Sequence, residues 1–214
     1  MPVEREIKLD VSSDYRLPDL SDASAGISAE DRGVHVLRAT YWDTANLDLL
    51  RRGFGLRYRT TDGGEGQWTV KGATTRQGIA VVRDEVNIEG DGDRPPDVAL
   101  RSVEVSPRAL APVARLETSR HIVDLVTTGG RRWAELCDDT VHILDGMRSV
   151  TTFRELELEI LGEADDPRVL EVISKLRAAG ASEPRHGAKY VRALRALGYA
   201  LPAPDAKVHS LSDG

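Results

Sequence analysis

The feature that most constrains this chain is a set of short segments in which charged and apolar residues alternate with a period of two. The clearest is the segment from Glu155 to Glu159, where glutamates at every second position are separated by Leu156 and Leu158. Side chains two residues apart share one face of a β-strand. The segment therefore predicts a strand with one strongly charged face and one apolar face.

The start of the chain repeats this pattern. Glu4, Glu6 and Lys8 occupy alternate positions, with Ile7 and Leu9 between and beyond them. A solvated sheet edge would show such a face, because antiparallel sheets often have one wet side. One wall of a metal and phosphate site would show it too. The opening segment alone leaves both interpretations open.

The rest of the sequence predicts an antiparallel sheet followed by helices. The alternation and the turn signals predict about eight strands and four or five helices, an α+β chain. Eight antiparallel strands can close into a barrel, which removes exposed edges. We expect one domain over residues 1–200 and a flexible tail over 201–214. Strands are expected at 3–11, 34–43, 54–61, 67–72, 79–89, 116–127, 131–137, 141–144 and 152–161, and helices at 14–25, 46–53, 96–104, 166–179 and 187–197.

Composition narrows the class of protein. A length of 214 residues suits one domain, and a net charge of -6 argues against a protein whose whole surface coats nucleic acid. The single cysteine, Cys137, fits a reducing compartment and is expected to be a buried structural thiol. No apolar run reaches ~18 residues, so no membrane span is expected. We see no secretory signal pattern at the N-terminus and expect a cytoplasmic protein.

The signs of the charges are segregated among the predicted strands. Acidic residues dominate the first and last strands, whereas Arg57 with Arg59, Lys71 and Arg83 lie on the middle ones. Solvated faces would mix the two signs. Aligned carboxylates repel one another unless a cation lies between them, and Mg²⁺ prefers such oxygen ligands. Paired arginines suit phosphate, because a guanidinium bonds two oxygens at once. The pattern predicts a cleft with metal on one wall and polyphosphate on the other.

This arrangement implies a barrel in which the usual distribution of polar and apolar side chains is reversed. The charged faces would line the interior, and helices would cover the apolar outer faces, whereas a small barrel is normally filled by apolar side chains. Burying so many charges is costly unless they are paired or bind a ligand. A purely structural barrel with wet outer faces is the alternative, and it predicts an apolar interior without tight metal binding.

The sequence resembles the CYTH family of triphosphate tunnel metalloenzymes over residues 3 to about 197. One difference is that the family's Ser-Lys-Tyr motif begins with Ala188 here, which removes a hydroxyl and keeps the lysine. The resemblance rests on an ordered set of motifs: Glu4-x-Glu6-x-Lys8, Tyr41-Trp42-Asp43-Thr44, Leu56-Arg57-Tyr58-Arg59, Val70-Lys71-Gly72, Arg83-x-Glu85, Arg120, Glu155-x-Glu157-x-Glu159 and Ala188-Lys189-Tyr190.

The resemblance implies an eight-stranded antiparallel tunnel that acts on triphosphates with Mg²⁺ or Mn²⁺. Two choices stay open: whether Asp138 or Asp139 faces inward, and which two glutamates of the last row hold metal, with Glu155 and Glu157 favoured over Glu159. The implied metal ligands are Glu4, Glu6, Glu155, Glu157 and Glu159, with Glu85 and Asp138 assisting. The implied phosphate-binding and catalytic residues are Lys8, Arg57, Arg59, Lys71, Arg83, Arg120 and Lys189.

We expect a metal-dependent hydrolase of inorganic triphosphate, because the motifs account for phosphate and nothing evident reads a base or a thiamine ring. Thiamine triphosphate hydrolysis and adenylate cyclase activity are alternatives within the same family. A non-catalytic polyphosphate-binding module is an alternative of another class, although polyanion binding alone needs no row of glutamates. The expected partner is a small triphosphate or polyphosphate, with no nucleic acid or membrane, and a homodimer is possible.

Overall fold

The computed structural model describes residues 3–73, 75–77, 79–101, 105–162 and 166–201. The helices are α1 (Asp48–Arg51), α2 (Asp97–Leu100), α3 (Pro167–Ala178) and α4 (Lys189–Ala196), with a 3-10 turn at Pro107–Ala109. The strands are β1 (Val3–Val11), β2 (Ile27–Asp43), β3 (Gly55–Thr61), β4 (Gly66–Lys71), β5 (Thr75–Gln77), β6 (Ala80–Glu89), β7 (Ala111–Thr127), β8 (Arg132–Asp145) and β9 (Arg148–Ile160).

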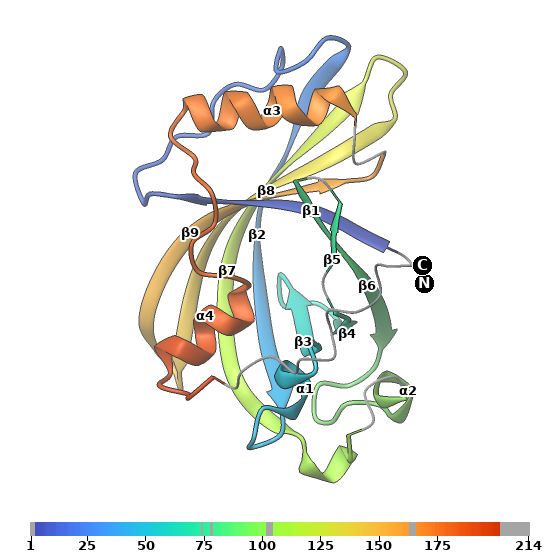
Figure 1. Ribbon diagram of the computed structural model, residues 1–214, viewed down its shortest axis with the longest axis vertical. Helices are drawn as coiled ribbons and strands as arrows, with labels where there is room; N and C mark the ends of the chain where they lie inside the picture. The colour runs from blue at the N-terminus through green and yellow to red at the C-terminus, as the bar shows by residue number, and fades with distance from the viewer. Residues whose placement is uncertain (1–2, 74, 78, 102–104, 163–165, 202–214) are drawn as a thin grey trace.

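The strands form one antiparallel sheet that closes on itself (Figure 1). Their order is β1-β9-β8-β7-β2-β3-β4-β6, and β1 also pairs with β6. The short strand β5 pairs with β6 beside this closure. The predicted eight-stranded barrel of an α+β protein is thereby confirmed.

The register brings the first and last strands together. Glu6 pairs with Glu159 and Lys8 pairs with Glu157 across β1 and β9. Because paired positions in a sheet point to the same side, the two charged faces merge into one wall. The acidic strands that are farthest apart in the sequence are therefore neighbours in the barrel.

The apolar faces of these strands point outward and are covered by α3 (Figure 1). Asp166 caps this helix by accepting a hydrogen bond from the amide of Arg168, and Pro167 occupies its first turn, as the sequence predicted. Its buried face, Val169, Val172, Ile173 and Leu176, packs against Leu9, Leu136 and Leu158 of the barrel. Burial of one such side chain stabilises the fold by about 2 kcal/mol.

Helix α4 contributes to a second apolar cluster, at one end of the barrel interior. Tyr190 and Leu194 pack there with Val141 and Ile143, which lie on the same face of β8 as the charged residue Asp139. The charged interior is therefore bounded at this end by a helix. No helix in the described part of the chain is long and apolar enough to span a membrane.

Several predicted elements differ from the structure. The helix expected at 14–25 is absent, because Pro18 interrupts it and Tyr15 and Leu20 pack into the core from an irregular segment. The strand expected from residue 34 begins at Ile27, where charged residues concealed the alternation. The helix expected at 96–104 is a single turn, and residues 102–104, like 202–214 of the expected tail, lie outside the described residues. The domain boundary near residue 200 stays a prediction.

The strands expected at 131–137 and 141–144 are one continuous strand, β8. The sequence Asp138-Asp139-Thr140 suggested an interruption, because aspartate is depleted in strands. Each aspartate has an arginine partner instead, Arg154 on one face and Arg120 on the other. These two ion pairs allow the strand to continue.

Candidate functional site

A cavity of about 340 Å³ lies inside the barrel. All the predicted site residues except Glu155 and Asp138 line it. The structure thus brings together residues that are spread from the first to the last strand and the final helix. The predicted residues that line the cavity are Glu4, Glu6, Lys8, Arg57, Arg59, Lys71, Arg83, Glu85, Arg120, Glu157, Glu159 and Lys189.

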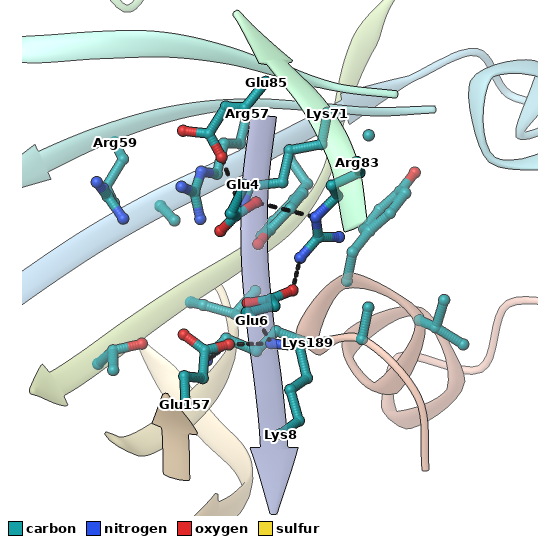
Figure 2. Close-up of a pocket in the computed structure, with 18 of the residues that line it drawn as sticks. Glu4, Glu6, Lys8, Arg57, Arg59, Lys71, Arg83, Glu85, Glu157 and Lys189 are labelled. Carbon is teal, nitrogen blue, oxygen red and sulfur yellow. Dashed lines mark hydrogen bonds and ion pairs between the residues drawn. The ribbon is translucent and has the colours of Figure 1, made fainter. Parts of the chain in front are cut away.

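The glutamates of β1 are held by cations from neighbouring strands (Figure 2). The ammonium of Lys71 lies 2.8 Å from a carboxylate oxygen of Glu4, and the guanidinium of Arg83 lies 3.0 Å from the same oxygen. Arg83 also bonds Glu6, which lies 3.3 Å from Lys8. The opening Glu-x-Glu-x-Lys motif is therefore part of a charge network inside the barrel and not a solvated edge.

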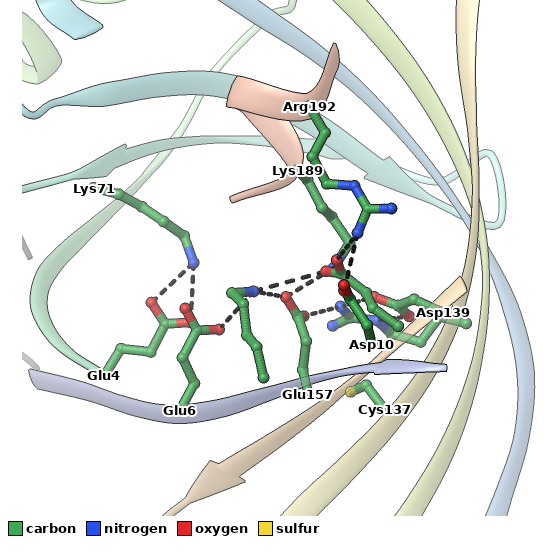
Figure 3. Close-up of polar contacts among 12 residues, drawn as sticks. Glu4, Glu6, Asp10, Lys71, Cys137, Asp139, Glu157, Lys189 and Arg192 are labelled. Carbon is green, nitrogen blue, oxygen red and sulfur yellow. Dashed lines mark hydrogen bonds and ion pairs between the residues drawn. The ribbon is translucent and has the colours of Figure 1, made fainter. Parts of the chain in front are cut away.

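A second part of the network centres on Lys189, at the start of α4 (Figure 3). Its ammonium lies 2.5 Å from Glu155, 2.7 Å from Glu157 and 2.9 Å from Asp139. Burial alone would lower the pKa of Lys189, but these three carboxylates raise it far above its ordinary value. Arg120 joins the same cluster through two hydrogen bonds to Asp139, of 2.8 and 2.6 Å. Its charge opposes that of Lys189, but the three carboxylates outweigh it and keep the lysine charged.

Arg57 and Arg59 differ from the other cations of the cavity. Both point into it (Figure 2), and neither forms an ion pair with a carboxylate of the described residues. The Nε atom of Arg57 is buried and has no hydrogen-bond partner among the residues that the structure describes. The charge of Arg57, together with burial, lowers the pKa of Arg59 to about 10. Burial acts to lower the pKa of Arg57, but Tyr41 and Glu85 outweigh it and raise the value. The two guanidiniums are half-buried and repel each other, and neither is neutralised by an ion pair within the described part of the chain.

The carboxylates near the same end of the cavity have contrasting environments. Burial acts to raise the pKa of Glu85, but Lys71 and Arg57 outweigh it and lower the value to about 2. Burial and the nearby carboxylates of Glu4 and Glu135 raise the pKa of Glu159. The acidic wall therefore contains a crowded group of carboxylates that the surrounding cations do not fully neutralise.

The structure resolves the choice between the two aspartates of β8. Asp139 faces inward, is fully buried and bonds Arg120 and Lys189. Asp138 faces the opposite side, where it accepts two hydrogen bonds from Arg154, of 2.8 and 2.6 Å. The expectation that Asp138 assists at the site is therefore wrong in geometry, because the alternation of β8 directs Asp139 inward.

The glutamate row of β9 points inward as predicted, but its members are not equivalent. Glu157 and Glu159 line the cavity, whereas Glu155 lies beyond it, bonded to Lys189 and 3.4 Å from Arg192. The preference for Glu155 over Glu159 as a metal ligand stays a prediction, and this placement does not favour it. Glu155 instead fastens α4 to the barrel.

Sequence reasoning missed several residues that line the cavity. Glu135 and Cys137 precede Asp139 at two-residue steps on β8, and the same alternation could have found them. The thiol of Cys137 donates a 3.4 Å hydrogen bond to Glu135, and burial raises its pKa far above the ordinary value. It is buried, as expected, and the raised pKa disfavours the reactive thiolate. An apolar part of the lining came from loops and helix ends and had no signal in strand alternation: Leu50, Phe54, Ala188 and Val191.

Known proteins resemble this chain in both sequence and fold. A protein of Mycobacterium tuberculosis described as uncharacterized is 30% identical over 210 residues, which cover 91% of this chain and 40% of that protein. The chain thus spans less than half the length of the curated relatives that it matches.

Two solved structures share the fold. A candidate adenylate cyclase from Bacillus halodurans superimposes with a TM-score of 0.62 at 18% identity, covering 90% of this chain and 98% of that one. A candidate adenylyl cyclase from Hippeastrum, described as having a dominant triphosphatase activity, superimposes with the same TM-score of 0.62 at 19% identity. The match covers 93% of this chain and 98% of that one. The CYTH domain family matches residues 2–190 of this chain. With its charged, closed barrel and this match over most of its length, the chain belongs to the CYTH family.

Proposed function

We propose that this protein hydrolyses inorganic triphosphate inside the barrel with the help of a divalent metal ion. CYTH family members act on phosphoanhydride bonds. The observation that carries the proposal is the pair Arg57 and Arg59, two half-buried cations that line the cavity and form no ion pair with a carboxylate of the described residues. A polyphosphate supplies the missing negative charge, because its oxygens match the donors of two adjacent guanidiniums.

The acidic wall has the donor chemistry for the divalent ion that CYTH enzymes generally use. Glu4, Glu6, Glu157 and Glu159 offer hard carboxylate oxygens from the paired strands β1 and β9. Burial raises the pKa of Glu159, and the nearby carboxylates of Glu4 and Glu135 raise it further, which supports a site that a cation would stabilise. In the described part of the chain no three such side chains are already arranged around one point, since lysines and arginines hold these carboxylates.

A divalent ion bound here would polarise a phosphate oxygen and lower the pKa of a bound water molecule. The residues of the chain bind the substrate, orient it and compensate its charge. Arg57 and Arg59 of β3 bind and orient the phosphates. Lys71 and Arg83 line the cavity from the next two strands, β4 and β6, where they compensate charge that develops on the transferred group. The walls of the barrel, with α4 at one end, exclude bulk water and strengthen these interactions.

The size of the cavity favours a small substrate. Its volume of about 340 Å³ is near the lower end of the ~300–1,000 Å³ typical of small-molecule sites. One observation favours a second candidate, a triphosphate with an organic group such as thiamine triphosphate or a nucleotide. Leu50, Phe54 and Val191 form an apolar part of the lining on which a ring could pack.

Phosphate release from a panel of inorganic triphosphate, thiamine triphosphate, ATP and long-chain polyphosphate tests the proposal. Each compound is assayed with Mg²⁺, with Mn²⁺ and with a chelator. Metal-dependent release that is fastest from inorganic triphosphate supports it. Faster release from thiamine triphosphate or ATP favours the second candidate. Tight polyphosphate binding without release indicates a binding module that lacks catalytic activity.

A matched pair of variants tests the location of the site. Glu4→Gln keeps the size of the side chain and removes a carboxylate that faces the cavity, so metal-dependent activity should fall by at least tenfold. Glu117 pairs with Arg38, and its side chain is 39% exposed. The variant Glu117→Gln should therefore leave activity unchanged. Full metal-dependent activity in Glu4→Gln would show that the site is assigned to the wrong residues.

A further inference from the structure

Asp43 is a fully buried carboxylate that the proposed reaction does not use. One of its oxygens accepts hydrogen bonds from the amides of Thr44 at 2.7 Å and Leu49 at 2.9 Å. The other accepts from the amide of Leu50 at 3.0 Å and from the hydroxyl of Tyr190 at 2.9 Å. All four bonds are made to the carboxylate of a fully buried residue, where hydrogen bonds are stronger than in solvent. Asp43 thus joins the loop after β2 to helix α4.

The loop side of this junction is held in a strained conformation. Leu47 has φ of 56° and ψ of 45°, a left-handed conformation that costs a leucine free energy and persists only where surrounding contacts enforce it. The amides of Leu49 and Leu50, two and three residues after Leu47, donate their hydrogen bonds to Asp43. The loop in turn places Leu50 and Phe54 in the cavity lining. Asp43 therefore helps to shape one part of the cavity wall.

The helix side of the junction positions Lys189. Tyr190 follows this lysine directly, its hydroxyl bonds Asp43, and its ring stacks on Tyr41 with centroids 4.8 Å apart and an interplanar angle of 6°. On the opposite side, Arg192 lies 3.2 Å from Asp10 of β1. Successive residues turn by ~100° around a helix, so Tyr190 and Arg192 lie on either side of Lys189. The helix is held from two walls while its first lysine reaches into the charge network.

We infer that Asp43 is a positioning residue: through Tyr190 it fixes the start of α4 and thereby holds the ammonium of Lys189 in the tunnel. For catalysis the inference rests on the proposed triphosphate hydrolysis, but the structural part is independent of it. Without Asp43, the β2 side of α4 keeps the stacking on Tyr41 and apolar packing, which do not fix the helix as closely as a buried charged hydrogen bond.

Amide hydrogen exchange of the full chain tests the structural part. Asp43→Asn replaces one acceptor oxygen by a donor, and Tyr190→Phe removes only the hydroxyl and keeps the ring. Both variants should exchange the amides of α4 about tenfold faster, with α3 unchanged. Asp48→Asn is the control, because Asp48 begins α1 directly after this loop and the described partners of its carboxylate are Thr44 and Arg51. Unchanged α4 exchange in both Asp43→Asn and Tyr190→Phe would overturn the inference.

A double-mutant cycle tests the functional part. The affinity for inorganic triphosphate without metal is measured by calorimetry for Asp43→Asn, Lys189→Met and the double variant. Asp43→Asn should weaken binding about threefold to tenfold in the natural background and have no further effect beside Lys189→Met. If Asp43→Asn weakens triphosphate binding equally in the natural protein and in Lys189→Met, Asp43 does not act through Lys189. If the unsubstituted protein binds no triphosphate, the proposed function fails, and the exchange experiment still decides whether Asp43 positions the helix.

Discussion

Replacement of Arg59 by methionine should stabilise the ligand-free protein while it weakens triphosphate binding. The charge of Arg57, aided by burial, lowers the pKa of Arg59 from 12.5 to about 10. One pKa unit corresponds to ~1.4 kcal/mol, so holding the charge of Arg59 costs the folded state about 3 kcal/mol. The sign follows from linkage: a lowered pKa of a base means that this cost is fully present below pH 10 and disappears as the pH rises toward 12.5.

The net gain is smaller than this cost, because the side chain also packs its apolar stem and is not wholly shielded from water. We expect Arg59→Met to raise the free energy of unfolding at pH 7 by about 1–2 kcal/mol, or ~3–8 °C in melting temperature. The assay is urea unfolding in a buffer free of phosphate and metal. Added triphosphate should raise the melting temperature of the natural protein more than that of the variant.

Arg38→Met is the matched control for this prediction. Arg38 lies on the neighbouring strand, is 60% exposed and pairs with Glu117 on the outer face at 2.9 Å. Its loss should change the free energy of unfolding by less than ~1 kcal/mol and leave triphosphate binding unaltered. If Arg59→Met destabilises the protein by more than 1 kcal/mol, the two arginines are not held against their mutual repulsion and the reasoning fails.

Three further predictions concern the polar network. Lys189→Met should lower the free energy of unfolding by about 3 kcal/mol in urea, because three buried carboxylates lose a shared cation but keep others; a loss below 1 kcal/mol would contradict this. Asp138→Asn should reduce stability without changing triphosphate affinity in calorimetry, whereas Asp139→Asn should weaken both; equal effects on affinity would refute the assignment of faces. Cys137 should not react with an aromatic disulfide reagent until the protein is unfolded, and rapid reaction of the folded protein would contradict its burial.

The barrel and most of its interior could be predicted because strand alternation is a local property. The spacing of Glu4, Glu6 and Lys8 on β1 decides which side chains share a face, whatever the rest of the chain does. Segregation of the two signs among strands then indicated that these faces meet inside. The closed sheet, with β1 paired to both β9 and β6, confirmed that expectation.

The details that the sequence did not predict depend on tertiary structure or on a one-residue shift. Asp138 and Asp139 are adjacent, so only the register of β8 against its neighbours decides which of them faces the cavity. The apolar stripe of α4 would fit the outside of a barrel as well as one end of its interior. The absent helix at 14–25 is a different case, because Pro18 lies within the segment and by itself disfavours a continuous helix.

The role of Asp43 could not have been found from its sequence motif. The segment from Tyr41 to Thr44 lies at the end of a strand, and a single aspartate there usually begins a turn. Its partner Tyr190 lies 147 residues away. A contact at such a separation depends on the whole barrel and cannot be read from local patterns.

The rate of phosphate release from inorganic triphosphate in saturating Mg²⁺ tests the central claim most directly, when it is compared between the natural protein and Arg57→Ala. The buried Nε atom of Arg57 has no hydrogen-bond partner in the described part of the chain. Loss of one preorganised charge donor should reduce kcat about 10²- to 10³-fold, with Arg38→Ala unchanged. If Arg57→Ala releases phosphate as fast as the natural protein, the arginine pair does not act on a triphosphate, and the proposed site is wrong.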